Sequence, residues 1–231
     1  MYLDPYYMLY MLPAFLLMLL TSWYVRAAYN KWGQVPARSR MSGYEAAQRL
    51  IAAGGLYGVR IEGVAGELTD HYDPRDKTLR LSAAVARGNS VASLAVAAHE
   101  LGHAMQDAEG YLPLRFRAAL VPMVNIGSYL GWIFIMAGLL IGWSGLAWLG
   151  VIFFAGGALF ALATLPVEFN ASARAKRLLS ESGLILDEQE RRGVNRVLNA
   201  AALTYVAGLV TAVLQLLYYV SLVGGLGRRQ D

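Results

Sequence analysis

Three residues in one short stretch of the chain could bind a metal ion and activate water. The stretch is VAAHELGHAMQD, residues 96–107, which contains His99, Glu100 and His103. On a helix, residues four apart lie on one face about one turn apart, so both imidazoles could reach one ion. The carboxylate of Glu100 projects from a neighbouring position, where it could take a proton from a water molecule without binding the metal. This H-E-x-x-H pattern predicts a zinc hydrolase with Glu100 as its general base.

The remaining ligands of such a site must come from a short list of residue types. The chain has no cysteine, which excludes disulfides and thiolate metal sites and leaves His, Asp and Glu as ligands. A catalytic zinc ion takes three protein ligands and keeps one position for water. The third ligand could be His71, the one further histidine, or Glu168, which follows a long apolar stretch. Pro166 suits the start of a helix that would carry Glu168. From the residues alone, both candidates stay open.

The elements that must position this site include membrane spans. The chain is 57% hydrophobic, and residues 5–25, 118–167 and 197–226 contain no Asp, Glu, Lys or Arg. A spanning helix needs about 20 apolar residues, so the middle stretch holds two spans, separated by a Gly- and Ser-containing turn at 142–145. The first segment lacks the basic start and small-residue cleavage site of a signal peptide and is expected to remain as an anchor. We predict four transmembrane helices, at 5–25, 118–141, 146–167 and 197–226.

The distribution of positive charge predicts how these spans are oriented. Of the 20 Lys and Arg residues, 18 lie in the two polar segments, and only Arg228 and Arg229 follow the last span. By the positive-inside rule, both polar segments face the cytoplasm and both termini lie outside. The net charge of +4 is therefore assigned to cytoplasmic loops rather than to a nucleic-acid partner, and no nucleic acid is expected.

The two polar segments have different predicted structures. Residues 27–115 form a small α+β domain with a helix capped by Ser42, short strands at 58–62 and 78–82, and the motif helix at 90–108. If strand 78–82 lies at an edge of its sheet, it could bind an extended peptide by β-augmentation. Residues 168–196 form a helical segment that carries Glu168. The fold class is thus a mainly α membrane protein with a small cytoplasmic α+β catalytic domain.

Several stretches, taken together, resemble one known family. Residues 99–106, 165–172, 70–74 and 198–206 are similar to the YugP-type bacterial membrane zinc metallopeptidases, and the resemblance covers essentially the whole chain. More distantly, the chain resembles the HtpX heat-shock proteases and the CAAX prenyl endopeptidases. The resemblance implies a zincin-like domain of the gluzincin type, in which His99, His103 and Glu168 bind one zinc ion. The distant relatives carry an aspartate four residues after the glutamate, where this chain has Ser172, whose hydroxyl orients an imidazole more weakly.

These observations predict a membrane-anchored zinc endopeptidase of the bacterial plasma membrane that cleaves membrane or misfolded polypeptides at the cytoplasmic surface. An intramembrane protease is the first alternative, but that class uses an aspartate in a later span, and no span here contains one. A non-catalytic scaffold or chaperone-like protein is the second, and the intact Glu100 argues against it. The lipid bilayer and a polypeptide substrate are the expected partners; a homo-oligomer or a membrane-protein partner is left open. Candidates for supporting the metal site or stabilising the oxyanion are His71, Tyr72, Ser172, Arg174 and Tyr205.

Overall fold

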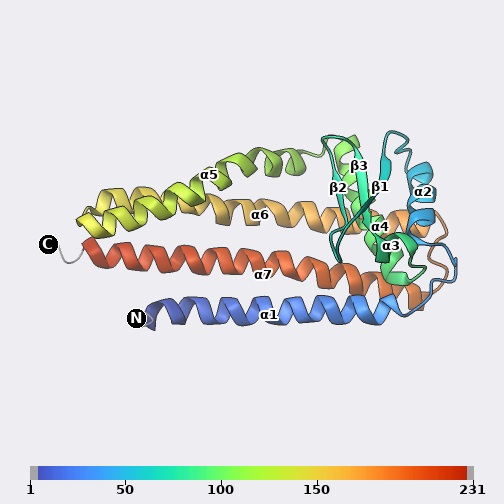
Figure 1. Ribbon diagram of the computed structural model, residues 1–231, viewed down its shortest axis with the longest axis horizontal. Coiled ribbons are helices and arrows are strands. Elements are labelled where there is room, and N and C mark those ends of the chain that lie inside the picture. The colour runs from blue at the N-terminus through green and yellow to red at the C-terminus, as the bar shows by residue number, and fades with distance from the viewer. Residues whose placement is uncertain (1–4, 228–231) are drawn as a thin grey trace. The chain divides into compact units, whose positions relative to one another are not determined.

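The computed structural model describes residues 5–227, which form seven helices and one small sheet (Figure 1). The elements in chain order are α1 (Pro5–Gly33), α2 (Gly43–Ala53), β1 (Arg60–Val64), β2 (His71–Asp73), β3 (Thr78–Ser82), α3 (Ala83–Arg87), α4 (Val91–Ala108), α5 (Leu112–Ile141), α6 (Ser144–Glu181) and α7 (Glu188–Gly227). By length and composition, α1, α5, α6 and α7 could each cross a bilayer. The prediction of a mainly helical chain with four candidate spans and a small sheet is confirmed. Arg228 and Arg229, used in the charge count, lie outside the described residues.

The described chain divides into two compact units. The helical unit contains residues 5–21, 115–166 and 204–227, and the mixed unit contains residues 22–114 and 167–203. Helices α1, α5, α6 and α7 each contribute residues to both units. All of the residues that form the H-E-x-x-H motif and its immediate surroundings belong to the mixed unit.

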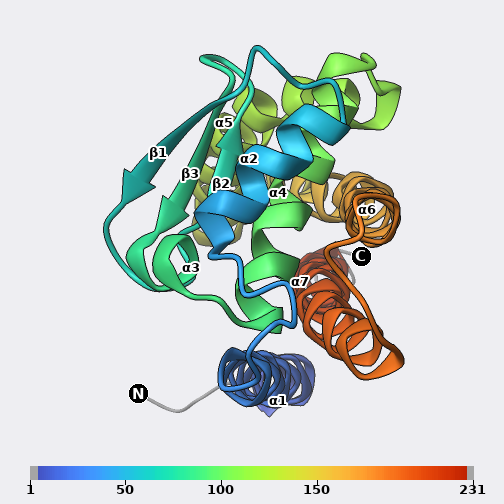
Figure 2. The same cartoon turned by 90° about the vertical axis from the view of Figure 1, so that its right-hand side faces the viewer.

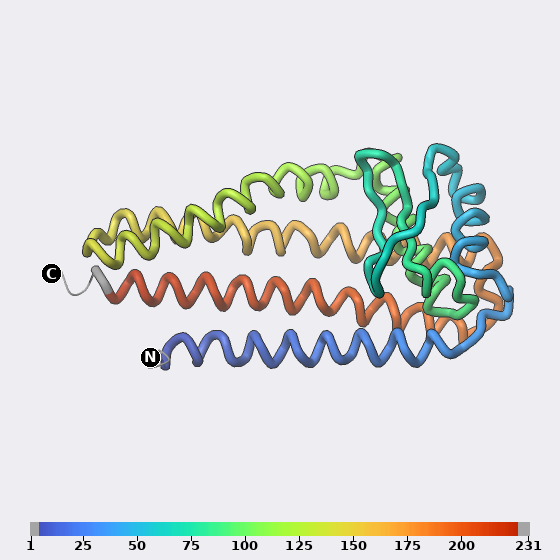
Figure 3. The backbone as a smooth tube through the Cα atoms, viewed as in Figure 1, coloured from blue at the N-terminus to red at the C-terminus, as the bar shows by residue number. Residues whose placement is uncertain are grey.

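Small residues bring α5 and α6 together in the helical unit, where the two helices run side by side (Figure 3). A Cβ added to Gly131 would lie 2.8 Å from the carbonyl oxygen of Gly150, and one on Gly138 would lie 2.5 Å from the backbone nitrogen of Ala147. Such close backbone approach is typical of helix pairs in membranes, where packing and not the hydrophobic effect holds helices together.

The sheet of the mixed unit has the order β1-β3-β2, with β1 parallel and β2 antiparallel to β3. The strand predicted at 78–82 is present as β3, but it is the central strand and both of its sides are paired. The expectation that this strand offers an edge to a peptide is therefore wrong. The outer strand β2 was not predicted from the sequence, because its three residues are too few to show an alternating pattern.

The motif helix α4 is the centre of the mixed unit's hydrophobic core. The hydroxyl of Ser90 caps the helix by accepting the backbone N–H of Ser93 at 3.1 Å. Leu94 and Leu101 on α4 are completely buried, together with Leu50 of α2 and Leu79 of β3. Figure 2 shows α2, α4 and the sheet gathered around this core. A helix packed on several sides in this way holds its polar face at a defined position.

Glu168 is carried by α6 in a way that differs from the prediction of a separate helix beginning at Pro166. The helix α6 runs without a break from Ser144 to Glu181, with Pro166 inside it. Proline removes one N–H from the helical ladder, and the remaining bonds of this long helix tolerate that loss. The helix ends before Gly183, whose positive φ of 66° allows the turn, and Asp187 then accepts the Glu190 N–H at 2.7 Å as α7 begins.

Candidate metal centre

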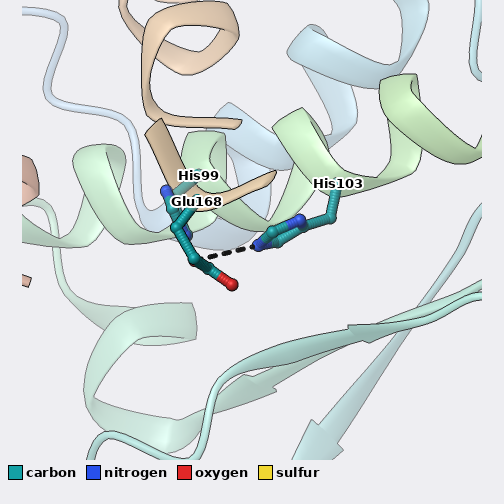
Figure 4. A group of neighbouring side chains, drawn as sticks. All are labelled: His99, His103 and Glu168. Atoms are coloured by element: carbon teal, nitrogen blue, oxygen red, sulfur yellow. Dashed lines mark hydrogen bonds and ion pairs between the residues drawn. The ribbon is translucent and has the colours of Figure 1, made fainter. Parts of the chain in front are cut away.

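Three potential metal ligands from two helices meet in the mixed unit (Figure 4). The Oε2 atom of Glu168 on α6 lies 3.3 Å from Nε2 of His99 and 3.5 Å from Nε2 of His103, both on α4. A ligand atom from each of the three residues lies within 4.8 Å of the other two. In a tetrahedral site with bonds of about 2.0–2.1 Å, neighbouring ligand atoms are about 3.3 Å apart, so this arrangement fits a zinc ion.

Close packing of α4 against α6 brings the glutamate to the histidines. Gly102 directly precedes His103 in the motif, and a Cβ at this position would collide with the carbonyl oxygen of Ala171 on α6. Gly102 thus has a structural reason to lack a side chain. Its role was not predicted, although a glycine inside a helical pattern is a sign of close backbone approach.

The buried side chain of Gln106 orients His103. Its amide nitrogen donates to the carbonyl oxygen of Val167 at 2.8 Å and to Oδ1 of Asn170 at 2.9 Å. Its Oε1 atom is therefore an acceptor, and it lies 3.0 Å from Nδ1 of His103. The imidazole must carry its proton on Nδ1, which leaves the lone pair of Nε2 directed toward the other ligands. Sequence reasoning missed this contact; the signal was a polar residue one turn after His103 on the same helix face.

Ser172 performs the corresponding task for His99. Its hydroxyl oxygen lies 3.2 Å from Nδ1 of His99, and the side chain is buried on α6 one turn after Glu168. The hydroxyl can accept the Nδ1 proton and leave Nε2 available to a metal, but a neutral acceptor polarises the ring less than a carboxylate does. Both histidines are thus held in the tautomer that a metal ligand requires.

The charges of the site suit a cation. Burial alone would raise the pKa of Glu168, but hydrogen bonds from His103 and His99 hold that pKa well below its usual range. Burial would likewise lower the pKa of His103, and the Glu168 and Glu100 carboxylates more than offset it. A divalent cation held between the three side chains would be attracted by the carboxylate of Glu168, and its binding would release any proton that the ligand atoms carry.

Glu100 lies beside the three candidate ligands and is not part of their group. Its Oε2 atom accepts the backbone N–H of Tyr72 on β2 at 3.1 Å, and burial raises the pKa of the carboxyl group against the opposing effect of His99 and His103. The group with converging ligand atoms contains His99, His103 and Glu168 and does not include Glu100. The carboxylate is thus placed next to the ligands and fixed from the β2 side.

The other predicted residues are placed differently. His71 is exposed on β2 with Nδ1 2.8 Å from the carbonyl oxygen of Thr69, and it does not join the ligand group. The Tyr72 hydroxyl donates to Asp107 at 2.9 Å; burial first, and then this bond, raise the pKa of Tyr72 well above its usual range. Arg174 binds Oδ1 of Asn170 at 2.7 Å and so supports the Gln106 amide from the far side. Tyr205 lies on α7 in the helical unit.

The chain is similar to known proteins over most of its length. A family model described as "Putative neutral zinc metallopeptidase" matches residues 7–224. The chain is also 44% identical over 196 residues to the "Putative membrane protease YugP" of Bacillus subtilis (strain 168), which covers 85% of this chain and 87% of that protein. No solved structure matches the chain. With four candidate spanning helices, it is a multi-pass membrane protein. The chain belongs to the neutral zinc metallopeptidase family.

Proposed function

We propose that this protein is a membrane-anchored zinc endopeptidase that hydrolyses membrane or misfolded polypeptides at the cytoplasmic surface of the bacterial plasma membrane. The observation that carries the proposal is the convergence of His99, His103 and Glu168, with Glu100 beside them but outside the ligand set. A structural zinc site fills its fourth position with a protein ligand, whereas a catalytic site keeps that position open. Three ligands and an adjacent carboxylate match the catalytic type.

The ligand set defines the chemistry. Two imidazole nitrogens and one carboxylate oxygen suit zinc, which when bound would polarise a substrate carbonyl and lower the pKa of water. The protein's part is to hold both imidazoles with Nε2 free, through Gln106 and Ser172. Glu168 supplies the negative charge that partly neutralises the cation. These contacts fix the site before substrate arrives, which reduces the reorganisation needed during the reaction.

Glu100 is the proposed general base. One of its carboxylate oxygens takes a proton from the attacking water as the oxygen–carbon bond forms, and the same group delivers that proton to the amide nitrogen as the carbon–nitrogen bond breaks. The Tyr72 N–H holds Oε2 of Glu100 and leaves the second oxygen, Oε1, for this transfer. The carboxylate is therefore constrained without being consumed by an ion pair with a neighbouring cation.

The outer edge of β2, beside Glu100, is the proposed binding site for substrate. Because the Tyr72 N–H donates to Glu100 and not to β3, that edge of the sheet faces the catalytic carboxylate. An extended polypeptide that pairs with β2 would lie beside Glu100, and an unfolded segment satisfies this need for extended backbone. The edge is short, since β2 contains three residues. Side-chain contacts beyond the strand would supply the remaining affinity.

Two observations support cleavage at the cytoplasmic surface. The helix α4 is not among the candidate spans found in residues 5–227, which favours a surface site over one within the bilayer. The polar segments hold 18 of the 20 Lys and Arg residues, which favours a cytoplasmic location. Fusion of the same cleavable peptide to a cytosolic or a periplasmic tag tests the side directly. Release of the periplasmic tag alone would contradict the proposed orientation.

The substitution Glu100→Gln tests catalysis. We expect the variant to bind zinc as wild type does and to lose proteolysis, because the amide retains the acceptor for the Tyr72 N–H but cannot take a proton. Metal content is measured on the purified protein, and membrane-protein fragments are compared in cells expressing each form. Glu181→Gln, an exposed change on α6, is the matched control and should retain both properties. Undiminished fragment formation with Glu100→Gln would contradict the mechanism.

A further inference from the structure

A cavity of about 600 Å³ lies in the mixed unit, between the end of α1 and the start of α7, and contains none of the residues of the metal centre. Aromatic rings and cationic side chains dominate its lining: Trp23, Tyr24, Lys31, Trp32, Arg192 and Arg196. The volume is within the range of small-molecule sites, roughly 300–1,000 Å³. The combination of rings with three cations indicates a ligand that has both an anionic and an apolar part.

The position of these residues along their helices places the cavity at the level of the lipid headgroups. In α1, the charge-free stretch of the first candidate span ends at Val25, within the segment that lines the cavity. In α7, the charge-free stretch begins at Val197, directly after Arg196. Trp and Tyr are enriched at the membrane interface, and Lys and Arg mark its cytoplasmic side. The lining therefore coincides with the ends of two spans.

The cations of the cavity lack protein counter-ions. Within residues 5–227, Lys31, Arg192 and Arg196 form no ion pair, and the lining contains no Asp or Glu. Lys31 lies with its ammonium nitrogen 5.8 Å from the centre of the Trp32 ring, so it faces the same space. Three uncompensated positive charges around one cavity create a site for an anion.

A second cavity in the mixed unit differs from the larger one, because two of its three cations have carboxylate partners. That cavity, of about 270 Å³ between α6 and α7, is lined by Lys176, Arg177 and Arg191 and contains no aromatic residue. Its two arginines each have a carboxylate partner, Arg177 with Glu181 and Arg191 with Glu188. The two cavities therefore have the same number of cations but differ in whether those cations have carboxylate partners.

The walls of the larger cavity are rigid where α1 meets α7. Trp32 is 9% exposed and packs on Gly193, where an added Cβ would lie 2.5 Å from Cε3 of the indole. Trp23, by contrast, is 68% exposed, on the span side of the cavity. A free phosphate ion would use only the cations, whereas an exposed indole at the end of a span suits contact with the glycerol and acyl region of a lipid.

We propose that this cavity binds the headgroup of an anionic phospholipid, with Lys31, Arg192 and Arg196 around the phosphate. Arginine and lysine both bind phosphate oxygens through charge-assisted hydrogen bonds. Trp23 and Tyr24 pack against the glycerol region. Basic pockets between transmembrane helices on the cytoplasmic side are recurrent sites for such headgroups.

The test measures lipid binding to the full-length protein in neutral detergent by native mass spectrometry. Phosphatidylglycerol should bind more tightly than phosphatidylcholine, and the double variant Arg192→Gln/Arg196→Gln should weaken phosphatidylglycerol binding about 30-fold, since each cation near an anionic headgroup contributes about fivefold. The double variant Arg177→Gln/Arg191→Gln loses the same charge at the second cavity and should bind phosphatidylglycerol as wild type does. Lys31→Gln, a single change on α1, should weaken binding about fivefold.

Three results would overturn the proposal. Equal binding of phosphatidylcholine and phosphatidylglycerol would show that the site does not prefer a headgroup of net negative charge to a zwitterionic one. Equal losses in the two double variants would show that net charge alone attracts the lipid. Displacement of phosphatidylglycerol by an equal concentration of inorganic phosphate would identify the site as one for free phosphate. The thermal unfolding midpoint of each variant shows whether it is folded. If the double variant Arg192→Gln/Arg196→Gln is unfolded, the phosphatidylglycerol affinity of Lys31→Gln tests the proposal instead.

Discussion

The substitution Gln106→Leu separates the orientation of a metal ligand from the stability of the fold. Leucine fills a similar volume, but it removes the acceptor for Nδ1 of His103 and both amide donors to α6. Without the acceptor, His103 can adopt the other tautomer or rotate. Loss of such a supporting contact lowers metal affinity by about 10- to 100-fold, which is about 1.4 to 2.8 kcal/mol.

The loss in the free energy of unfolding caused by Gln106→Leu should be smaller than its loss in metal-binding free energy. Arg174 still donates to Oδ1 of Asn170 at 2.7 Å, so that oxygen keeps a partner. Val167 lies inside α6, where its carbonyl oxygen can keep its helical bond. We therefore expect a loss of about 1 kcal/mol in the free energy of unfolding of the zinc-free protein, the value of one ordinary hydrogen bond.

Gln106→Glu should show the opposite pattern. A carboxylate still accepts the Nδ1 proton of His103, and more strongly than an amide oxygen does, so metal affinity should be at least that of wild type. The same carboxylate would face the carbonyl oxygen of Val167 and Oδ1 of Asn170, which are both acceptors, and this repulsion should lower stability more than leucine does. The exposed change Gln48→Leu on α2 is the control and should affect neither property.

Zinc affinity is measured by competition with a chromophoric chelator, and stability by denaturant unfolding of the zinc-free protein. If Gln106→Leu bound zinc as wild type does, the assignment of Gln106 as the residue that orients His103 would be wrong. If the leucine and glutamate variants lost zinc affinity equally, the effect would come from repacking of α4 against α6 and not from the hydrogen bond to His103.

Substitutions at three further positions probe the same centre. Ser172→Asp should strengthen zinc binding, because a carboxylate accepts the Nδ1 proton of His99 more strongly than a hydroxyl does. Ser172→Ala removes the acceptor and should weaken zinc binding about tenfold. The chelator titration measures both variants, and unchanged zinc affinity in both would exclude a role for this contact. Gly102→Ala should lower both the unfolding midpoint and zinc content through its collision with Ala171, whereas Gly63→Ala, with open space around it, should leave zinc content unchanged. Glu168→Ala should lose zinc on dialysis at neutral pH, and retention of one zinc per chain would reject it as a ligand.

The spans and the motif were accessible from the sequence because they depend on local patterns. A charge-free stretch of sufficient length predicts a membrane helix whatever it packs against, and Ser90 before an apolar run predicts the start of α4. The outer strand β2 exists only through its pairing with β3, and three residues carry no pattern of their own. The effects of Gln106 and Gly102 were equally inaccessible, since both depend on packing against a helix that begins 38 residues after Gln106.

The continuity of α6 was mispredicted for a related reason. Proline is a good first residue of a helix and a poor interior one, so Pro166 indicated a start. Within a long apolar helix, however, the cost of one missing hydrogen bond is small compared with that of exposing a broken backbone to lipid. The apolar helix around Pro166, and not the proline itself, therefore determines that α6 continues through this position.

The placement of Glu168 within the chain determines when the protein can first bind its metal during biosynthesis. His99 and Glu168 are separated by 69 residues, and the chain between them includes α5 and most of the candidate span of α6. At a synthesis rate of about 5–20 residues per second, the ribosome adds His99 about 3 to 14 s before Glu168. A nascent chain that carries the H-E-x-x-H motif but not yet α5 and the spanning part of α6 lacks its third ligand. The complete set of candidate ligands therefore exists only after the hairpin of α5 and α6 has been translated, so a chain that holds α1 and α4 alone cannot yet bind the metal through all three.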